Sequence, residues 1–151
     1  MTVRVRSPVT GRVLPLSEVT DPTFAQGMVG PGVALDPEDA MSTALSPVTG
    51  VVALVGSHAF ILTTAEGAAV LVHLGIETVA LRGQGFTPHV LHGEIVRTGQ
   101  PVISWDPAAV RASGRSALCP VIALDATATN LLQHHHPGPI TAGDPLFDWR
   151  H

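Results

Sequence analysis

Two histidines, His58 and His73, stand among apolar residues in the segment SHAFILTTAEGAAVLVHLGIET, residues 57–78. Imidazole can act as a nucleophile, a metal ligand or a proton carrier near neutral pH. Two rings on one face could transfer a phosphoryl group, with one ring attacking phosphorus and the other binding phosphoryl oxygens. They could also supply half of a zinc site, or they could be structural histidines bonded to the backbone. Residue type and spacing leave these three readings open.

A β-hairpin would bring the two histidines together. The pattern predicts strands over 58–63 and 68–73, joined by the loop 64–67. In this register His58 lies directly opposite His73, and opposed residues share a face with β-carbons about 4.5–5.5 Å apart. A loop one residue different in length would send the two rings to opposite faces.

Two short repeats organise the rest of the chain. SPVTG begins at Ser7 and again at Ser46, and the related segments VRTGQPVISW and ITAGDPLFDW begin at Val96 and Ile140. Such turn-then-strand units are typical of all-β proteins. We therefore predict an antiparallel β-sandwich or barrel with a duplicated motif and a few short helical turns, formed by residues 1–151 as one domain.

Helix signals are few. Asp106 followed by Pro107 is a good helix start, residues 21–27 predict one turn ended by Gly27, and residues 125–136 predict another helical segment. The predicted strands are 3–6, 12–15, 33–35, 41–45, 50–55, 58–63, 68–73, 78–80, 93–96, 101–105, 118–123 and 146–149.

Composition narrows the function classes. The chain of 151 residues has 45% hydrophobic and 13% charged residues and a formal net charge of −4, which argues against nucleic-acid binding. Cys119 is the only cysteine, so no intrachain disulfide can form. No apolar run approaches the roughly 18 residues of a membrane span, and the first residues lack a signal-peptide pattern. We expect a cytoplasmic protein without direct membrane insertion.

Several segments together resemble the glucose-type enzyme IIA family (EIIA-Glc) of the bacterial phosphoenolpyruvate-dependent sugar phosphotransferase system (PTS). VHLGIETVALRGQGF resembles the family signature around its phosphorylated histidine, and SHAF resembles the segment carrying its second active-site histidine. The resemblance continues through SPVTGRVLPL, DPTFAQGMVGPGVAL, ALSPVTGVVALV and TGQPVISWD. It therefore covers nearly the whole chain, in the family's order.

The resemblance implies a phosphotransferase component that forms a phosphohistidine. His73 would accept the phosphoryl group on Nε2, and His58 would hold the phosphoryl oxygens. The donor would be the phosphocarrier protein HPr, and the acceptor would be the cysteine of a sugar-specific IIB domain. No cofactor is required, although His58 and His73 could bind zinc together with a partner's carboxylate.

The resemblance also implies a surface around the histidines that binds partners. Apolar side chains there would exclude water, which would otherwise compete for the phosphoryl group. Gly75 would let the backbone approach the site. The implied docking residues are Phe24, Val29, Phe60, Leu71 and Gly75.

Two carboxylates, Asp21 and Glu77, match family positions that flank the histidines. They would attract an arginine of HPr and repel the phosphoryl group once transfer begins. Glu77 stands where the family commonly has Asp. The family also commonly has Thr two residues before the supporting histidine, where this chain has Gly56. Ser57, a backbone carbonyl or water would then have to orient His58.

Two other functions stay open. In a regulatory binding module, the unphosphorylated form would bind and inhibit permeases or metabolic enzymes. A zinc peptidase of similar β architecture would need a His-x-His pair on a strand, which the sequence lacks. The consecutive histidines 134–136 fall in a Pro- and Gly-containing loop and are assigned no role.

Overall fold

Antiparallel β-strands make up most of the chain, and short helical turns join them. The computed structural model describes residues 1–133 and 135–151. The strands are β1 (Thr2–Arg6), β2 (Gly11–Pro15), β3 (Gly32–Pro37), β4 (Ser42–Leu45), β5 (Gly50–Val55), β6 (Ala59–Thr63), β7 (Ala69–His73), β8 (Phe86–Pro88), β9 (Ile95–Val96), β10 (Pro101–Trp105), β11 (Cys119–Ala123), β12 (Leu131–Gln133), β13 (Gly138–Ile140) and β14 (Pro145–Arg150). The helical elements are η1 (Leu16–Glu18), α1 (Pro22–Ala25), η2 (Thr78–Leu81), α2 (Pro107–Ala112) and η3 (Ala128–Asn130).

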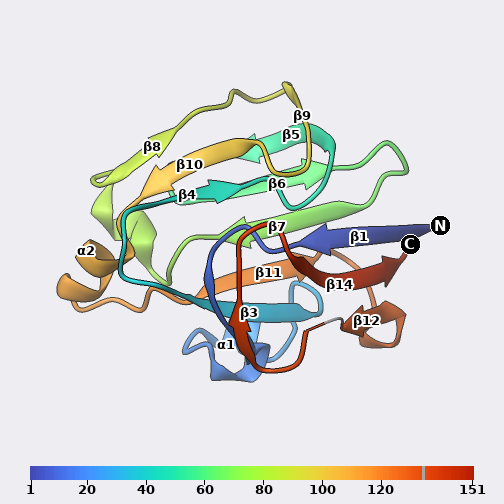
Figure 1. Ribbon diagram of the computed structural model, residues 1–151, viewed down its shortest axis with the longest axis horizontal. Coiled ribbons are helices and arrows are strands. Elements are labelled where there is room, and N and C mark those ends of the chain that lie inside the picture. Colours follow the sequence, from blue (N-terminus) through green and yellow to red (C-terminus); the bar gives the residue numbers. More distant parts are fainter. Residues whose placement is uncertain (134) are drawn as a thin grey trace.

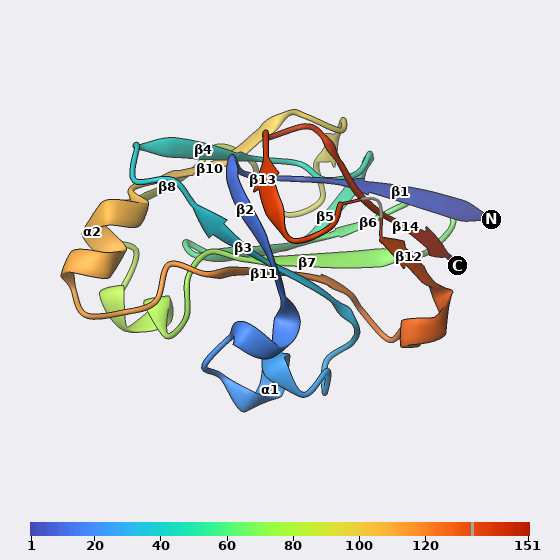
Figure 2. The same ribbon diagram turned by 60° about the horizontal axis from the view of Figure 1, so that its bottom comes forward.

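The strands form one large sheet and two small ones. The large sheet has the order β13-β2-β3-β11-β7-β6-β5-β9, and the small sheets have the orders β1-β14-β12 and β4-β10-β8. Figure 1 shows β1 and β14 side by side, with the two chain ends together. Figure 2 shows β1, β4 and β10 on one side of β3, β7 and β11, and α1 on the other side. The predicted all-β sandwich is confirmed.

The two SPVTG repeats are structural equivalents that bond to each other. The Ser7 hydroxyl donates to Val9 O at 2.7 Å, and the Ser46 hydroxyl donates to Val48 O at 2.6 Å. Across the repeats, the amide of Arg6 donates to Pro47 O at 3.0 Å, and the amide of Leu45 donates to Pro8 O at 2.9 Å. This reciprocal pairing relates the two halves of the fold.

The two longer repeats bond to these turns in the same way. The amide of Ser7 donates to Asp144 O, and the amide of Ser46 donates to Gln100 O, both at 2.8 Å. The return bonds, from Gly143 to Ser7 O and from Gly99 to Ser46 O, are also both 2.8 Å. The duplicated motif in the sequence is therefore a duplicated structure.

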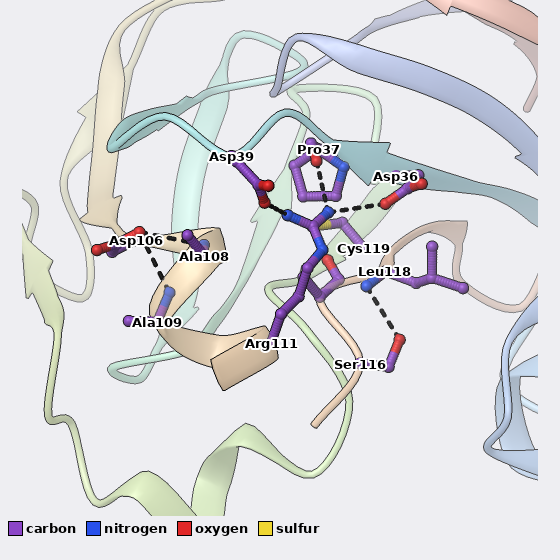
Figure 3. Close-up of polar contacts among 11 residues, drawn as sticks. Asp36, Pro37, Asp39, Asp106, Ala108, Ala109, Arg111, Ser116, Leu118 and Cys119 are labelled. Atoms are coloured by element: carbon purple, nitrogen blue, oxygen red, sulfur yellow. Dashed lines mark hydrogen bonds and ion pairs between the residues drawn. The ribbon is translucent and has the colours of Figure 1, made fainter. Parts of the chain in front are cut away.

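Aspartate caps start both α-helical turns, as the sequence indicates. The Asp21 carboxylate accepts from the amide of Thr23 at 2.9 Å and begins α1. The Asp106 carboxylate accepts from the amides of Ala108 and Ala109 at 3.1 and 3.3 Å and begins α2 (Figure 3). Capping bonds of this kind satisfy amides that have no partner inside the helix.

Several predicted elements are wrong. Residues 78–80 form the 3-10 turn η2 instead of a strand, flanked by Glu77 and Arg82 in the left-handed region. The predicted helix over 125–136 is a short 3-10 turn followed by β12, and His134 of that segment lies outside the described residues. The short strands β8, β12 and β13 were not predicted, because three-residue strands show little alternation.

The apolar residues form two clusters, on opposite faces of the large sheet. The main core lies between the sheets and includes fully buried Trp105, Phe60 and Phe147. The second cluster lies under α1. Its buried members are Val19, Phe24, Ala34, Ile76 and Ile122.

Candidate functional site: the histidine pair

The fold brings His58 and His73 into contact. Their ring centroids lie 5.0 Å apart, and the ring planes meet at 68°. The register that produces this contact differs from the predicted one: Ala59, not His58, lies opposite His73. By strand alternation alone, that register would put the two rings on opposite faces of the sheet.

A tight turn resolves this difference. Gly56 donates to Ala59 O at 2.9 Å, so Ser57 and His58 occupy the turn between β5 and β6 and precede the regular strand. The direction of the His58 side chain is therefore set by the turn and not by the pleat. The His58 carbonyl accepts from the Leu74 amide at 2.7 Å, which holds the turn against the end of β7.

A backbone carbonyl fixes the protonation pattern of the neutral His73 ring. The Nδ1 atom of His73 lies 2.6 Å from the carbonyl oxygen of Gly75. A carbonyl oxygen can only accept, so Nδ1 carries the proton and donates it to this bond. In the neutral ring Nε2 then has a free lone pair. The geometry leaves Nε2 as the ring nitrogen with an available lone pair.

Close packing shapes the loop that supplies this carbonyl. Gly75 has φ +79°, and a β-carbon built on it would lie 2.6 Å from Thr78 Cγ2 and 3.0 Å from Ser116 O. The next amide, that of Ile76, donates to the same Ser116 carbonyl at 2.9 Å. The position therefore requires glycine, both for its backbone angle and for space.

Burial keeps both imidazoles neutral over a wider pH range. The pKa of His73 is lowered from 6.5, chiefly because burial disfavours the charged ring, and the charge of His58 lowers it further. The Gly75 carbonyl and the Asp21 carboxylate act in the opposite direction on that pKa. Burial also lowers the pKa of His58. Only a neutral imidazole has a lone pair with which to act as a nucleophile.

Apolar side chains surround the rings, though not all of the predicted ones. The Phe24 ring centroid lies 5.3 Å from that of His73, and partly buried Leu71 and Val29 belong to the same cluster under α1. Phe60 lies in the main core and is fully buried. A partner cannot contact Phe60, and its predicted role in docking is wrong, because its strand alternation directs it inward.

The two predicted carboxylates, Asp21 and Glu77, have different surroundings. Asp21 caps α1, and its charge raises the pKa of His73, which places it within electrostatic reach of the ring. Glu77 is exposed and lines a hollow of about 420 Å³ together with Arg111 and Arg115. Its role toward a partner stays a prediction.

The absence of a threonine at Gly56 has a partial counterpart in the structure. The Ser57 hydroxyl lies 3.5 Å from Nδ1 of His58, the outer limit of a hydrogen bond. Ser57 is thus the side chain best placed to orient His58, as one of the sequence-based alternatives proposed. The bond is weaker than the carbonyl bond that orients His73.

The ion pairs of Arg111, which support the segment behind the Gly75 loop, were not predicted from the sequence. Arg111 of α2 bonds to the carboxylates of Asp36 and Asp39 at the end of β3 (Figure 3). This arrangement ties α2, and the segment carrying Ser116, to the large sheet. An arginine in the last turn of a short helix gives no sequence signal for such a contact.

Among the described residues, the histidine pair is not part of a complete metal site. Within 1–133 and 135–151, no group of three or more His, Cys, Asp or Glu side chains is arranged to hold a metal ion. The pair can therefore supply two zinc ligands, and a tetrahedral site would need others from outside these residues. In the same ranges, no helix has the length and apolar character needed to cross a membrane.

Comparisons with known proteins agree with the geometry. Residues 3–129 match the family model for the phosphoenolpyruvate-dependent sugar phosphotransferase system, EIIA 1. The glucose-specific EIIA component of Oceanobacillus iheyensis is 39% identical over 94% of this chain and 86% of its own length. The structure of glucose permease IIA from Mycoplasma capricolum matches with a TM-score of 0.89 and 28% identity, covering 99% of this chain and 97% of that one.

Two larger proteins contain a similar segment. The glucose-specific EIIBCA component of Corynebacterium glutamicum is 39% identical over 82% of this chain. The beta-glucoside-specific EIIBCA component of Bacillus subtilis is 40% identical over 78% of this chain. This chain spans only 18% and 19% of those two proteins.

Proposed function

We infer the function of the histidine pair from one premise: the chain belongs to the EIIA 1 family of the phosphoenolpyruvate-dependent sugar phosphotransferase system. It is accordingly a phosphotransfer component of that system. We propose that His73 is the phosphoryl acceptor, that phospho-HPr is the donor, and that the cysteine of a sugar-specific IIB domain is the final acceptor. The cytoplasm is the proposed location.

One observation carries the assignment of His73. The bond from its Nδ1–H to Gly75 O leaves Nε2 with a free lone pair beside a second imidazole. In the first step Nε2 attacks phosphorus, and the bond between phosphorus and the HPr nitrogen breaks. The ring becomes positively charged while Nδ1 keeps its proton, and the Gly75 carbonyl stabilises that charge.

The second step passes the phosphoryl group from His73 to the IIB domain. A thiolate of the IIB domain attacks phosphorus, and the electron pair of the P–N bond returns to Nε2 of His73. His58 would donate a hydrogen bond to the phosphoryl oxygens in both steps, where charge develops in the transition state. The rings, 5.0 Å apart, leave room for this contact beside the phosphoryl group.

The apolar surroundings suit transfer between protein surfaces. Phe24, Leu71 and Val29 would lie against the partner and exclude water from the phosphoryl group. The carboxylates of Asp21 and Glu77 would attract a basic side chain of HPr. Phosphorylation adds about −1.5 to −2 charge, so the docked complex would weaken after transfer.

The same surface suits the alternative, regulatory role. An unphosphorylated apolar face could bind permeases or metabolic enzymes, and the added phosphoryl charge would release them. In such a complex a partner's carboxylate could complete a zinc site on His58 and His73. No cofactor is proposed for phosphoryl transfer itself.

The test is phosphorylation with purified components. The protein is incubated with phosphoenolpyruvate, enzyme I and HPr, and its intact mass is measured. We expect one acid-labile phosphoryl group on wild type, none on His73→Gln, and retention on His58→Gln with slower transfer to IIB. His89→Gln is the matched control, since His89 is exposed and bonds to Ser104. No phosphorylation of wild type by competent HPr would refute the carrier role.

A further inference from the structure

The loop after β7 that carries Gly75 holds two unusual backbone conformations in three residues. Gly75 has φ +79° and Glu77 has φ +60°. A residue other than glycine in the left-handed region costs roughly 1 kcal/mol or more. Local preference therefore does not stabilise this loop, and contacts from the rest of the fold must hold it.

One buried side chain makes the contact that closes the loop. Thr78 is fully buried, and it is one of only four buried polar or charged residues in the part of the chain that the structure describes. Its hydroxyl donates to the carbonyl oxygen of Leu74 at 2.8 Å, which spans the loop from end to end. A buried hydroxyl without this acceptor would be costly, so the bond fixes both the side chain and the loop.

The same side chain also lies beneath Gly75. A β-carbon on Gly75 would lie 2.6 Å from Thr78 Cγ2, so the methyl group fills the space that glycine leaves. The opposite end of the bond, Leu74, donates its amide to His58 O at 2.7 Å. Thr78 thus contacts both Leu74, which bonds to His58, and Gly75, which bonds to His73.

We propose that Thr78 is a positioning residue for phosphoryl transfer: the bond from its hydroxyl to Leu74 O holds the loop so that Gly75 O binds Nδ1–H of His73. The inference rests on the proposed function, because positioning matters only if Nε2 reacts. Without the Thr78 bond, Gly75 O moves away from Nδ1, and the neutral ring divides between its two tautomers. The fraction with a proton on Nε2 has no lone pair there and cannot attack phosphorus.

The chain contains a matched control. Thr64 is also a buried threonine, and its hydroxyl accepts from the amide of Ala68 at 3.1 Å. That bond lies in the connection between β6 and β7, at the end of the hairpin away from His73. Thr64→Val therefore removes a comparable bond from the same hairpin without touching the Gly75 loop.

The first measurement uses the unphosphorylated protein alone. Nitrogen-15 NMR of the imidazoles reports which nitrogen of His73 carries the proton. We expect the Nδ1–H form to dominate in wild type, Thr78→Ser and Thr64→Val, and a measurable Nε2–H population to appear in Thr78→Val. An unchanged tautomer in folded Thr78→Val would overturn the proposal, as would the same change in Thr64→Val.

The second measurement is the rate of phosphorylation by phospho-HPr. Misplacing a reacting group by about 1 Å can cost 100-fold, so we expect a 10- to 100-fold loss in Thr78→Val and recovery in Thr78→Ser. Equal losses in the Ser and Val variants would contradict a role for the hydroxyl. If Thr78→Val does not fold, Thr78→Cys supplies a similar volume with a weaker donor and must give an intermediate tautomer population.

The two proposals fail in different ways. If wild type is never phosphorylated while Thr78→Val still shifts the tautomer, the carrier role is wrong and the positioning contact stands. If wild type is phosphorylated and Thr78→Val leaves both tautomer and rate unchanged, the positioning role is wrong and the carrier role stands.

Discussion

Replacing Gly75 by alanine tests the link between loop packing and the histidine site. The left-handed φ of +79° makes any β-carbon unfavourable by about 1–2 kcal/mol. The new methyl group would also lie 2.6 Å from Thr78 Cγ2 and 3.0 Å from Ser116 O. Overpacking typically costs about 1–3 kcal/mol, and the backbone oxygen cannot rotate away. The sum is a loss of about 2–5 kcal/mol in the free energy of unfolding.

Gly67→Ala is the matched control for this prediction. Gly67 has φ +87°, and a β-carbon there would meet nothing within 4 Å. That variant carries the backbone cost without the clash, so we expect about 1 kcal/mol. The difference between the two variants isolates the packing contribution at Gly75.

Urea unfolding and thermal unfolding measure both variants. For a chain of this size 1 kcal/mol corresponds to about 2–4 °C in Tm, so Gly75→Ala should unfold roughly 4–20 °C lower than wild type. The clash should also displace the carbonyl bonded to His73 and slow phosphorylation, which Gly67→Ala should leave unchanged. Equal destabilisation of the two variants, or a normal phosphorylation rate in Gly75→Ala, would refute the reasoning.

Other predictions follow from burial and charge. Because burial lowers the pKa of His58 and His73 below 6.5, the unfolded chain binds more protons than the folded one just below that pH. The folded protein therefore has its full stability with respect to these two rings above pH 6.5, and it loses stability as the pH falls from 6.5 toward the pKa values of the folded state. Tm measured from pH 8 to 5 should fall less in the His58→Gln, His73→Gln double variant than in wild type, and parallel curves would contradict this. Phe24→Ala removes a ring whose centroid lies 5.3 Å from that of His73, and it should lower the free energy of unfolding by about 3 kcal/mol. It should also expose the imidazole and raise the pKa of His73 toward 6.5, which NMR titration measures. A lower pKa would contradict desolvation as the main cause of the shift. Arg111→Gln removes two ion pairs and should lower the free energy of unfolding, measured in urea, by about 1 kcal/mol. The loss should be smaller in 1 M salt, and Arg4→Gln, which removes one exposed pair, should cost less than Arg111→Gln. A loss at Arg111 that does not depend on salt would show that ion pairing is not the cause.

The sequence by itself determined the fold class and the two histidines proposed to react. Short apolar runs separated by Gly and Pro predicted β-strands, and the repeated SPVTG segments predicted two related halves. These signals are local, since turn chemistry and strand alternation depend on neighbouring residues. The aspartate caps of α1 and α2 were readable for the same reason.

Tertiary structure alone decided how the two histidines meet. The predicted register was wrong by one residue, and contact is restored because His58 lies in a turn whose direction depends on Gly56, Ala59 and Leu74. Nor could the sequence show that Phe60 points into the core while Phe24 lies against His73. The positions of both rings depend on which face of the large sheet is covered by the small sheets and which by α1.

The bond that selects Nε2 also comes from the folded chain. A carbonyl two residues after His73 accepts from its ring only because the loop adopts left-handed backbone angles. Those angles persist because Thr78, Val110 and Ser116 pack around Gly75. Residue types along the chain therefore specified the available chemistry, and contacts between segments far apart in sequence determined which nitrogen of His73 keeps a free lone pair.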